Sequence, residues 1–191
     1  MSWTEIFGFL TGAASVLLAV RESAWNWPVG IANTVLFLFL FWHAKLYADA
    51  LLQVVYIVIS IFGWWNWIRG GEGRTELPIS RTKARSAIAL AAITALATAF
   101  IAALLRRYSD SAVPLWDGLT TALSLTAQYM LSRKLLENWF VWMTADVIYV
   151  ALYCYKSLYL TGVLYVVFFA MCVAGYIGWR KFLMQRAGVA A

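Results

Sequence analysis

The stretch that decides the fold runs from Glu137 to Tyr159 and reads ENWFVWMTADVIYVALYCYKSLY. It is almost wholly apolar and aromatic, yet it carries a carboxylate, Asp146, near its centre. On a helix, spacings of 4, 4, 3 and 4 positions place one stripe on a single face, made of Asn138, Trp142, Asp146, Tyr149 and Tyr153. A charge in the middle of an apolar span costs about 2.5–3.5 kcal/mol on insertion scales, so it normally faces a partner or a watery cavity. The stretch therefore predicts a ligand pocket inside a membrane.

The composition of the whole chain indicates a membrane protein of several spans. Of its 191 residues, 63% are hydrophobic and only 13% are charged, and the mean hydropathy is +0.75. A soluble domain has about a quarter charged residues. The net charge of +6 comes from basic residues in short loops, where they set topology, so it does not indicate nucleic-acid binding.

Seven spans are predicted, and each is helical because a lone strand would leave its backbone groups unpaired in lipid. They cover about Trp3–Val20, Trp25–Trp42, Leu46–Trp67, Ala87–Leu105, Pro114–Leu131, Trp139–Tyr155 and Leu158–Trp179. The turns between them are short, except for a charged, glycine-containing segment at 69–86.

The basic residues predict the orientation of these spans. Eleven Lys and Arg fall on the side of the 69–86 segment and the C-terminus, against four on the other side, which are Lys45, Arg106, Arg107 and Lys156. Because cytoplasmic loops carry the excess of basic residues, the N-terminus is expected outside and the C-terminus in the cytoplasm.

An internal repeat organises the chain. At a constant offset of 112 residues the first half matches the second without a gap, through Asn26-Trp27 with Asn138-Trp139, Leu46-Tyr47 with Leu158-Tyr159, Gly63 with Gly175 and Trp67 with Trp179. A three-helix unit reverses direction, so the uncharged fourth span acts as an inverter that turns the second unit back. We expect a 3+1+3 arrangement of parallel repeats related by an axis along the membrane normal. The predicted units are 1–68, a cytoplasmic loop 69–86, an inverter helix 87–105, the second repeat 106–182 and a cytoplasmic tail 183–191.

Polar stripes occur in both halves and should converge, since none could face hydrocarbon cheaply. The third span has Gln53, Tyr56, Ser60 and Trp64 on one face, and the seventh has Tyr165, Phe168 and Cys172 at the corresponding positions. Asn33, Gln53 and Gln128 can serve either as ligand contacts or as polar glue between helices. Ser60, Thr121 and Ser124 are expected to be glue. Trp27, Trp67 and Trp179 stand at span ends, where an aromatic belt at the membrane surface explains them, and Trp64 and Trp142 lie deeper.

The sequence offers little chemistry for an enzyme. His43 is the only histidine, the two cysteines have no metal-ligand spacing, and no nucleophile elbow, zinc-protease motif or P-loop is present. No catalytic residue, cofactor or metal site is predicted.

An ordered series of motifs resembles the PnuC-type vitamin transporters over nearly the whole chain except the fourth span and the tails. In the first half these are Asn33, Leu46-Tyr47-Ala48, Leu51-Leu52-Gln53, Tyr56 and Gly63-Trp64, and in the second they are Trp116-Asp117, Arg133-Lys134, Glu137-Asn138-Trp139 and Trp142. The resemblance implies duplicated three-helix units related to the SWEET sugar carriers, in the inner membrane of a bacterium. It also implies inward facilitated diffusion of nicotinamide riboside, which a cytosolic kinase then phosphorylates and traps.

We therefore expect a transporter for a vitamin-like cationic ring compound, nicotinamide riboside first. Thiamine or another B vitamin is the alternative within the family, and a channel or a non-transporting membrane scaffold or sensor is the alternative from another class. Aromatic faces attract a cationic ring, and a carboxylate adds Coulomb attraction. The expected substrate-binding residues are Asn33, Gln53, Tyr56, Trp64, Gln128, Asn138, Trp142, Asp146 and Tyr149. Partners are the substrate and the bilayer, with assembly into a homo-oligomer left open.

Overall fold

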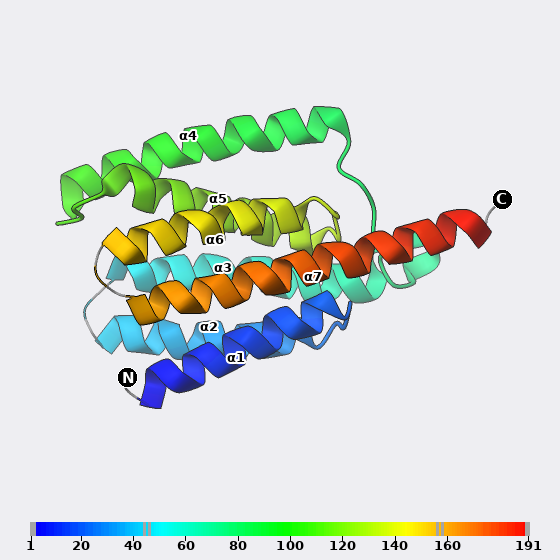
Figure 1. Ribbon diagram of the computed structural model, residues 1–191, viewed down its shortest axis with the longest axis horizontal. Helices are drawn as coiled ribbons and strands as arrows, with labels where there is room; N and C mark the ends of the chain where they lie inside the picture. The colour runs from blue at the N-terminus through cyan, green and yellow to red at the C-terminus, as the bar shows by residue number, and fades with distance from the viewer. Residues whose placement is uncertain (1–2, 44, 46, 156, 158, 190–191) are drawn as a thin grey trace.

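The computed structural model describes residues 3–43, 45, 47–155, 157 and 159–189, so Leu46, Lys156 and Leu158, which enter the predicted spans and charge count, lie outside it. The described residues form seven α-helices and one short 3-10 turn, with no strand, and the predicted all-α fold is confirmed (Figure 1). The helices are α1 (Trp3–Val20), α2 (Asn26–His43), α3 (Tyr47–Arg69), α4 (Ala84–Tyr108), α5 (Pro114–Ser132), α6 (Asn138–Tyr155) and α7 (Tyr159–Val189).

Two helices are longer than their hydropathy predicted. Helix α4 begins three residues before, and ends three residues after, the expected range 87–105. Helix α7 has 31 residues, roughly 46 Å at 1.5 Å per residue, and its end projects past the rest of the bundle (Figure 1). The predicted end near Trp179 followed the drop in hydropathy at Arg180 and Lys181. Arg, Lys, Met, Gln and Ala are good helix formers, so the helix continues into polar surroundings.

Three of the described helical segments are long and apolar enough to cross a bilayer by length and composition alone, namely Asp49–Arg69, Ala84–Tyr108 and Tyr159–Gln185. Helix α1 contains a shorter apolar stretch, Leu10–Val20. Helices α2, α5 and α6 run alongside these in the same bundle (Figure 1) and carry the Asn, Asp, Gln and Ser side chains that lower their mean hydropathy.

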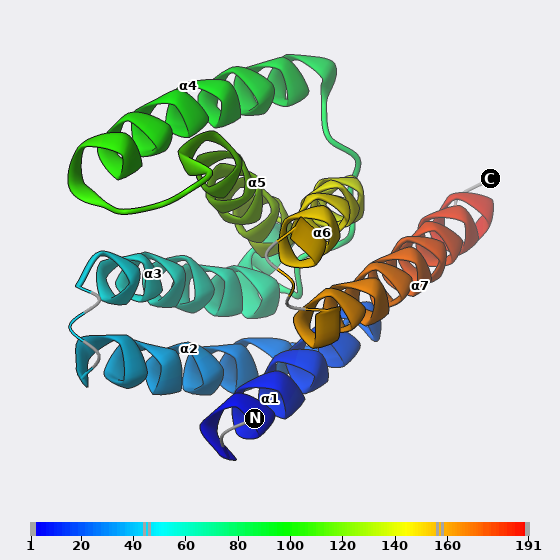
Figure 2. The ribbon, with the colours of Figure 1, turned by 60° about the vertical axis from the view of Figure 1, so that its left-hand side comes forward.

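The two three-helix units pack against each other in a symmetric way. Within the units α1 packs on α2 and α2 on α3, and likewise α5 on α6 and α6 on α7. Between the units α3 lies against α5, and α7 lies against α1, so each contact is the counterpart of the other (Figure 2). Helices α1 and α5 run in the same direction, as parallel repeats require, and α4 lies outside, against α5 (Figures 1 and 2).

Four tryptophans form the centre of the core where α1–α2 and α5–α6 turn. Trp27, Trp67, Trp139 and Trp179 are each at most 1% exposed. The expectation that three of them belong to a surface belt was wrong, because the helix ends converge here and each ring finds partners inside the protein. Trp27 meets Trp67 edge to face with centroids 5.5 Å apart, and Trp139 meets Trp179 in the same way at 5.3 Å.

The same tryptophans tie one repeat to the other. The Trp67 indole N–H donates to the carbonyl of Leu131 at 2.9 Å, and the Trp179 indole N–H donates to the carbonyl of Ala19 at 3.1 Å. The two donors, Trp67 and Trp179, are 112 residues apart, and so are the two acceptors, Ala19 and Leu131. The two hydrogen bonds are therefore equivalent under the symmetry of the repeat. The centroids of Trp67 and Trp179 themselves lie 5.8 Å apart.

A buried ion pair caps this tryptophan layer. Lys134 Nζ lies 2.8 Å from Glu22 Oε1, and Lys134 is 2% exposed. The ammonium also sits 4.5 Å from the ring centroid of Trp67, a cation–π distance. Glu22 and Lys134 are equivalent positions of the repeat, and both turn the chain with a positive φ, of 59° and 49°.

The predicted loop 69–86 is held against the second repeat. The backbone N–H of Ser80 donates to the carbonyl of Lys134 at 3.0 Å. The backbone N–H of Leu136 donates to the carbonyl of Ser80 at 2.9 Å. The carboxylate of Glu137 accepts from both the backbone N–H and the hydroxyl of Thr82, each at 2.7 Å. Ile79 joins the hydrophobic core. The segment thus closes the end of the bundle that carries the ion pair.

Candidate functional site

A cavity of about 330 Å³ lies between the two repeats. Six helices line it and α4 contributes no lining residue, as the uncharged sequence of the predicted span 87–105 suggested. The lining residues are Gly12, Ser15, Val16 and Ala19 of α1, Asn26, Trp27 and Gly30 of α2, Tyr56 and Ser60 of α3, Ser124, Gln128 and Leu131 of α5, Trp139, Trp142, Asp146 and Tyr149 of α6, and Tyr165, Phe168 and Cys172 of α7.

The cavity brings together five of the nine residues predicted to bind substrate. These are Tyr56, Gln128, Trp142, Asp146 and Tyr149. The other four, Asn33, Gln53, Trp64 and Asn138, are not among its lining residues.

Each of those four residues has a different place in the fold. Asn33 donates its side-chain amide to the Gly8 carbonyl at 2.7 Å and to the Thr11 hydroxyl at 2.6 Å, which joins α1 to α2. Asn138 is fully buried and donates to the Leu135 carbonyl at 2.6 Å, holding the turn before α6. Asn33 thus acts as polar glue between two helices, whereas the bond of Asn138 is local to the turn.

Helix α3 explains the positions of the other two. Tyr56 and Ser60 line the cavity, and Gly63 and Trp67, one and two turns further along, are buried in the core. At 100° per residue this inward stripe leaves Trp64 at its edge, where the side chain is 40% exposed. Gln53 is also off the stripe and half-buried.

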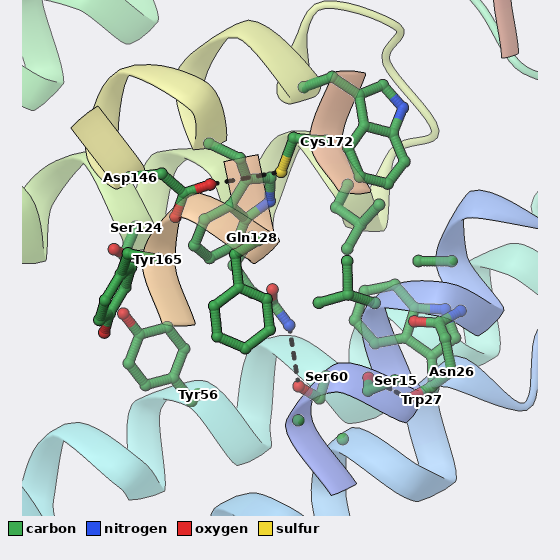
Figure 3. A pocket seen from close by; sticks show the side chains of 18 of the residues that line it. Ser15, Asn26, Trp27, Tyr56, Ser60, Ser124, Gln128, Asp146, Tyr165 and Cys172 are labelled. Atoms are coloured by element: carbon green, nitrogen blue, oxygen red, sulfur yellow. Dashed lines mark hydrogen bonds between the residues drawn. The ribbon is translucent and has the colours of Figure 1, made fainter. Parts of the chain in front are cut away.

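Asp146 is the charged group of the cavity wall. It is 4% exposed, and it accepts a hydrogen bond from the Cys172 thiol, with Sγ 3.6 Å from Oδ2 (Figure 3). Among the described residues no Lys, Arg or His forms an ion pair with it. A carboxylate can accept about four hydrogen bonds, so most of its acceptor capacity is free for a ligand.

Tyrosine rings flank the carboxylate. Tyr149 stacks on Tyr165 with centroids 4.5 Å apart, and Tyr165 stacks on Tyr153 at 5.3 Å. Asp146, Tyr165 and Tyr56 group at one side of the cavity, whereas Trp27 and Asn26 stand at the other (Figure 3). The site therefore has an anionic, aromatic side and a side closed by the tryptophan layer.

Two hydrogen bonds orient polar groups in the wall. Gln128 donates its side-chain amide to the Ser60 hydroxyl at 3.2 Å, which bridges α5 and α3 (Figure 3). Ser15 donates to the Asn26 carbonyl at 2.9 Å. Ser60 and Ser124, which were expected to be polar glue, both line the cavity, and Ser60 acts as such glue by accepting the bond from Gln128. The side-chain carbonyl oxygen of Gln128 can accept a hydrogen bond from a ligand hydroxyl.

The cavity lies on the axis that relates the repeats. Seven pairs of lining positions are 112 residues apart, namely 12 and 124, 16 and 128, 19 and 131, 27 and 139, 30 and 142, 56 and 168, and 60 and 172. The paired side chains differ in size and charge. Gly12 and Gly30 of the first repeat correspond to Ser124 and Trp142 of the second, so the second repeat supplies the bulkier side chains at these positions and the only carboxylate among the lining residues.

Ser15, Tyr165, Phe168 and Cys172 were not among the predicted site residues. The repeat offset could have found the last three, since they correspond to Gln53, Tyr56 and Ser60. Nothing in the sequence marks Ser15, which enters because the first helix passes beside Gly30. The described residues contain no group of three or more His, Cys, Asp or Glu placed to hold a metal ion.

Comparison with known proteins identifies the family. A family model described as nicotinamide mononucleotide transporter matches residues 2–181. The nicotinamide riboside transporter PnuC of Escherichia coli (strain K12) is 29% identical over 211 residues, which cover 97% of this chain and 88% of that protein. The riboflavin/roseoflavin transporter RibM of Streptomyces davaonensis is 28% identical over 182 residues, covering 93% and 84%.

A solved structure shares the fold. The crystal structure of the vitamin B3 transporter PnuC matches with a TM-score of 0.73 at 24% sequence identity, over 96% of this chain and 83% of that one. The seven described helices and their arrangement agree with this match. With 180 of its residues inside the family model, the chain belongs to the nicotinamide mononucleotide transporter family, a family of multi-pass membrane transporters.

Proposed function

We propose that this protein carries a nucleoside-like cationic ring compound, nicotinamide riboside first, into the cell by facilitated diffusion. The observation that carries the proposal is Asp146, a buried carboxylate on a cavity wall with no basic partner among the described residues. A charge held inside a membrane protein normally faces its partner or its substrate. A cationic ring bound beside Asp146 would supply the missing opposite charge.

The charge of the cavity favours a nucleoside over its phosphate ester. The lining residues include one carboxylate and no Lys or Arg. Phosphate groups are bound in proteins by Arg, Lys or helix N-termini, and a phosphate with no such partner would be desolvated at a large cost. A cavity wall without Lys or Arg therefore supports uptake of the unphosphorylated compound, which a cytosolic kinase then phosphorylates.

The size and shape of the cavity favour one flat ring with a polar arm. A volume of about 330 Å³ lies near the lower end of the range for small-molecule sites. Trp142 and Tyr149 offer faces on which a ring can stack, and Gln128 and Ser124 can bond to ribose hydroxyls. Thiamine also joins a cationic ring to a polar arm and is the second candidate. The three-ring flavin of riboflavin fits this volume less well.

The tryptophan layer supports a carrier rather than a channel. Trp27 and Trp139 line the cavity and are 1% exposed, and Trp67 and Trp179 pack directly behind them. This layer separates the cavity from the end of the molecule that bears the α1–α2 and α5–α6 turns. For a substrate to pass, the two repeats must move against each other around the site, as in other transporters built from repeats.

A thermal shift panel tests the substrate. Detergent-purified protein is heated with nicotinamide riboside, nicotinamide mononucleotide, thiamine and riboflavin in turn. A ligand that binds the folded state raises the melting temperature. At a concentration of 100 times its Kd it adds about 2.7 kcal/mol to the free energy of unfolding. The proposal expects the largest rise with nicotinamide riboside and none with the mononucleotide. A scaffold or sensor with no ligand in this set would show no rise at all.

Sealed proteoliposomes test the mode of transport. Substrate should equilibrate across the membrane without accumulating, since the described cavity wall holds one carboxylate and no histidine relay. Accumulation driven by a proton or sodium gradient would overturn facilitated diffusion, and Asp146 would then be the first residue to test for coupling.

A further inference from the structure

A second cavity, of about 800 Å³, lies between α4 and α5 on the outside of the second repeat. Its residues are Ser80, Arg81, Thr82, Lys83, Ser86, Ala89, Leu90, Ile93, Ala97, Ala122, Leu125, Thr126, Tyr129, Arg133 and Leu135. We call it the α4–α5 groove. It shares no lining residue with the substrate cavity.

The α4–α5 groove is basic at one end and apolar along its length. Arg81, Lys83 and Arg133 stand at the end where the 69–86 segment enters α4 and where α5 stops. All three side chains are exposed, and none forms an ion pair within the described chain. The neighbouring carboxylate of Glu137 is engaged by Thr82 and is not a lining residue of the groove. Three cations against one neighbouring carboxylate leave this end of the groove with a net positive charge, which favours an anion.

The apolar part of the groove has the depth of one membrane leaflet. On α4 the lining runs from Ser86 to Ala97, and on α5 from Arg133 back to Ala122. Each run covers twelve residues, and its eleven steps of 1.5 Å measure roughly 16 Å. The hydrocarbon core of a bilayer is about 30 Å thick, so one leaflet measures about half of that.

We propose that the α4–α5 groove binds an anionic phospholipid. The phosphate lies among Arg81, Lys83 and Arg133, and one acyl chain lies along Ala89, Ile93 and Ala97. Basic pockets between membrane helices bind anionic headgroups, and each Lys or Arg near the surface adds to the attraction. Because α4 joins the two repeats and contributes nothing to the substrate cavity, the lipid fixes this connecting helix on α5 without competing with substrate.

The headgroup is tested by removing its cations. The triple variant Arg81→Gln, Lys83→Gln, Arg133→Gln is compared with Arg74→Gln, Arg180→Gln, Lys181→Gln, which removes three exposed cations outside the groove. Delipidated protein of each kind is titrated with palmitoyl-oleoyl phosphatidylglycerol, with phosphatidylcholine of the same chains, and with soluble glycerol phosphate, and bound lipid is counted by native mass spectrometry.

The proposal expects phosphatidylglycerol to bind the wild type and the control alike. The groove variant should bind it about a hundredfold more weakly, which corresponds to roughly 3 kcal/mol. Phosphatidylcholine binding as tightly as phosphatidylglycerol, or a groove variant that binds like the wild type, would overturn it. Glycerol phosphate binding as well as the lipid would show a site for a free phosphate ester instead.

The acyl chain is tested by filling the groove. Ala89→Phe with Ala97→Phe places two rings in it, whereas Ala92→Phe with Ala99→Phe places the same rings on exposed positions of α4 that line neither this groove nor the cavity beside it. The first pair should lower phosphatidylglycerol affinity at least tenfold and the second should leave it unchanged. If the first pair instead alters the oligomeric mass while lipid binding is unaffected, a second copy of the chain is the occupant and the lipid proposal fails.

Discussion

At the scale of single residues, Asp146 sets the charge of the substrate cavity. Its carboxylate is buried and accepts a hydrogen bond from the Cys172 thiol. Replacing it by Asn keeps the shape and one acceptor oxygen but removes the charge. If the ligand is a cation, binding should weaken for the cation and change little for a neutral analogue.

The Asp146→Asn variant is therefore measured by titration calorimetry with nicotinamide riboside and with its reduced, uncharged form. We expect at least a tenfold loss of affinity for the cation only. Equal losses for both forms would assign Asp146 a structural role or hydrogen bonds alone.

Trp142 is the candidate stacking surface of the cavity. It lines the wall opposite Gly30, its small counterpart in the first repeat. Trp142→Ala should remove about 1–3 kcal/mol of ring stacking, a tenfold to hundredfold loss of affinity. The control is Trp65→Ala, which deletes an indole that is 57% exposed on α3. If calorimetry shows the same affinity for both variants, the ring of the substrate lies elsewhere.

At the scale of helices, two glycines set how closely neighbouring helices approach. A side chain at Gly63 would overlap the ring of Trp27, and one at Gly175 would come within 2.6–2.7 Å of the ring of Trp139. Gly63→Ala and Gly175→Ala should therefore each destabilise the protein by about 1–3 kcal/mol, the usual cost of overpacking.

The two substitutions should lower the melting temperature by similar amounts, because they stand at equivalent positions of the repeat. Gly12→Ala is the matched control, since its added carbon would meet nothing nearer than the Asn33 amide at 3.9 Å. Unequal shifts for Gly63 and Gly175 would show that the two halves no longer pack alike.

The helices were predicted well because the bilayer constrains them strongly. Apolar length and the 112-residue offset placed α1, α2, α5 and α6 within a few residues of their observed ends. The burial of Trp27, Trp67 and Trp179 was missed, because a tryptophan at a span end can face lipid headgroups or a converging core. Sequence position alone does not distinguish the two.

The substrate site was predicted in part for a related reason. Spacing identifies which residues share a face of a helix, but the rotation of the helix decides which part of that face turns inward. In α3 the predicted stripe and the cavity lining overlap at Tyr56 and Ser60, whereas Trp64 is 40% exposed and lies outside the lining.

At the scale of the whole molecule, the Glu22–Lys134 ion pair lies between the repeats at equivalent positions. Reversing one charge alone places like charges together in a buried site, and breaking such a pair costs about 3–5 kcal/mol. Exchanging both residues should restore most of the stability. A lysine at position 22 would then stand to Trp179 as Lys134 stands to Trp67.

The measurement is a set of melting temperatures for Glu22→Lys, Lys134→Glu and the double variant. We expect large drops for the single variants and recovery in the double variant. A double variant as unstable as the singles would mean that the pair depends on surroundings that the two halves do not share.

The distribution of basic residues predicts that the C-terminus lies in the cytoplasm. A reporter that is active only in the cytoplasm should be active when fused after Ala191, and silent when inserted near Ser109 in the α4–α5 turn. The reverse pattern would place the Glu22–Lys134 pair and the end of α7 outside the cell.

The mismatch between paired positions of the cavity has a consequence for how cargo is chosen. If the two repeats were identical, a ligand could bind in two equally favourable poses, related by the axis between the repeats. In this chain Thr34 and Gly30 occupy the positions that correspond to Asp146 and Trp142, so under the proposed function a ligand would prefer one of the two poses. Helix α6 would then supply most of the contacts to the ligand, and the glycines of α1 and α2 would leave room for it. Changing the substrate specificity to another vitamin would then require substitutions in α6. The glycines of α1 and α2 would set only the size of the largest ligand that fits.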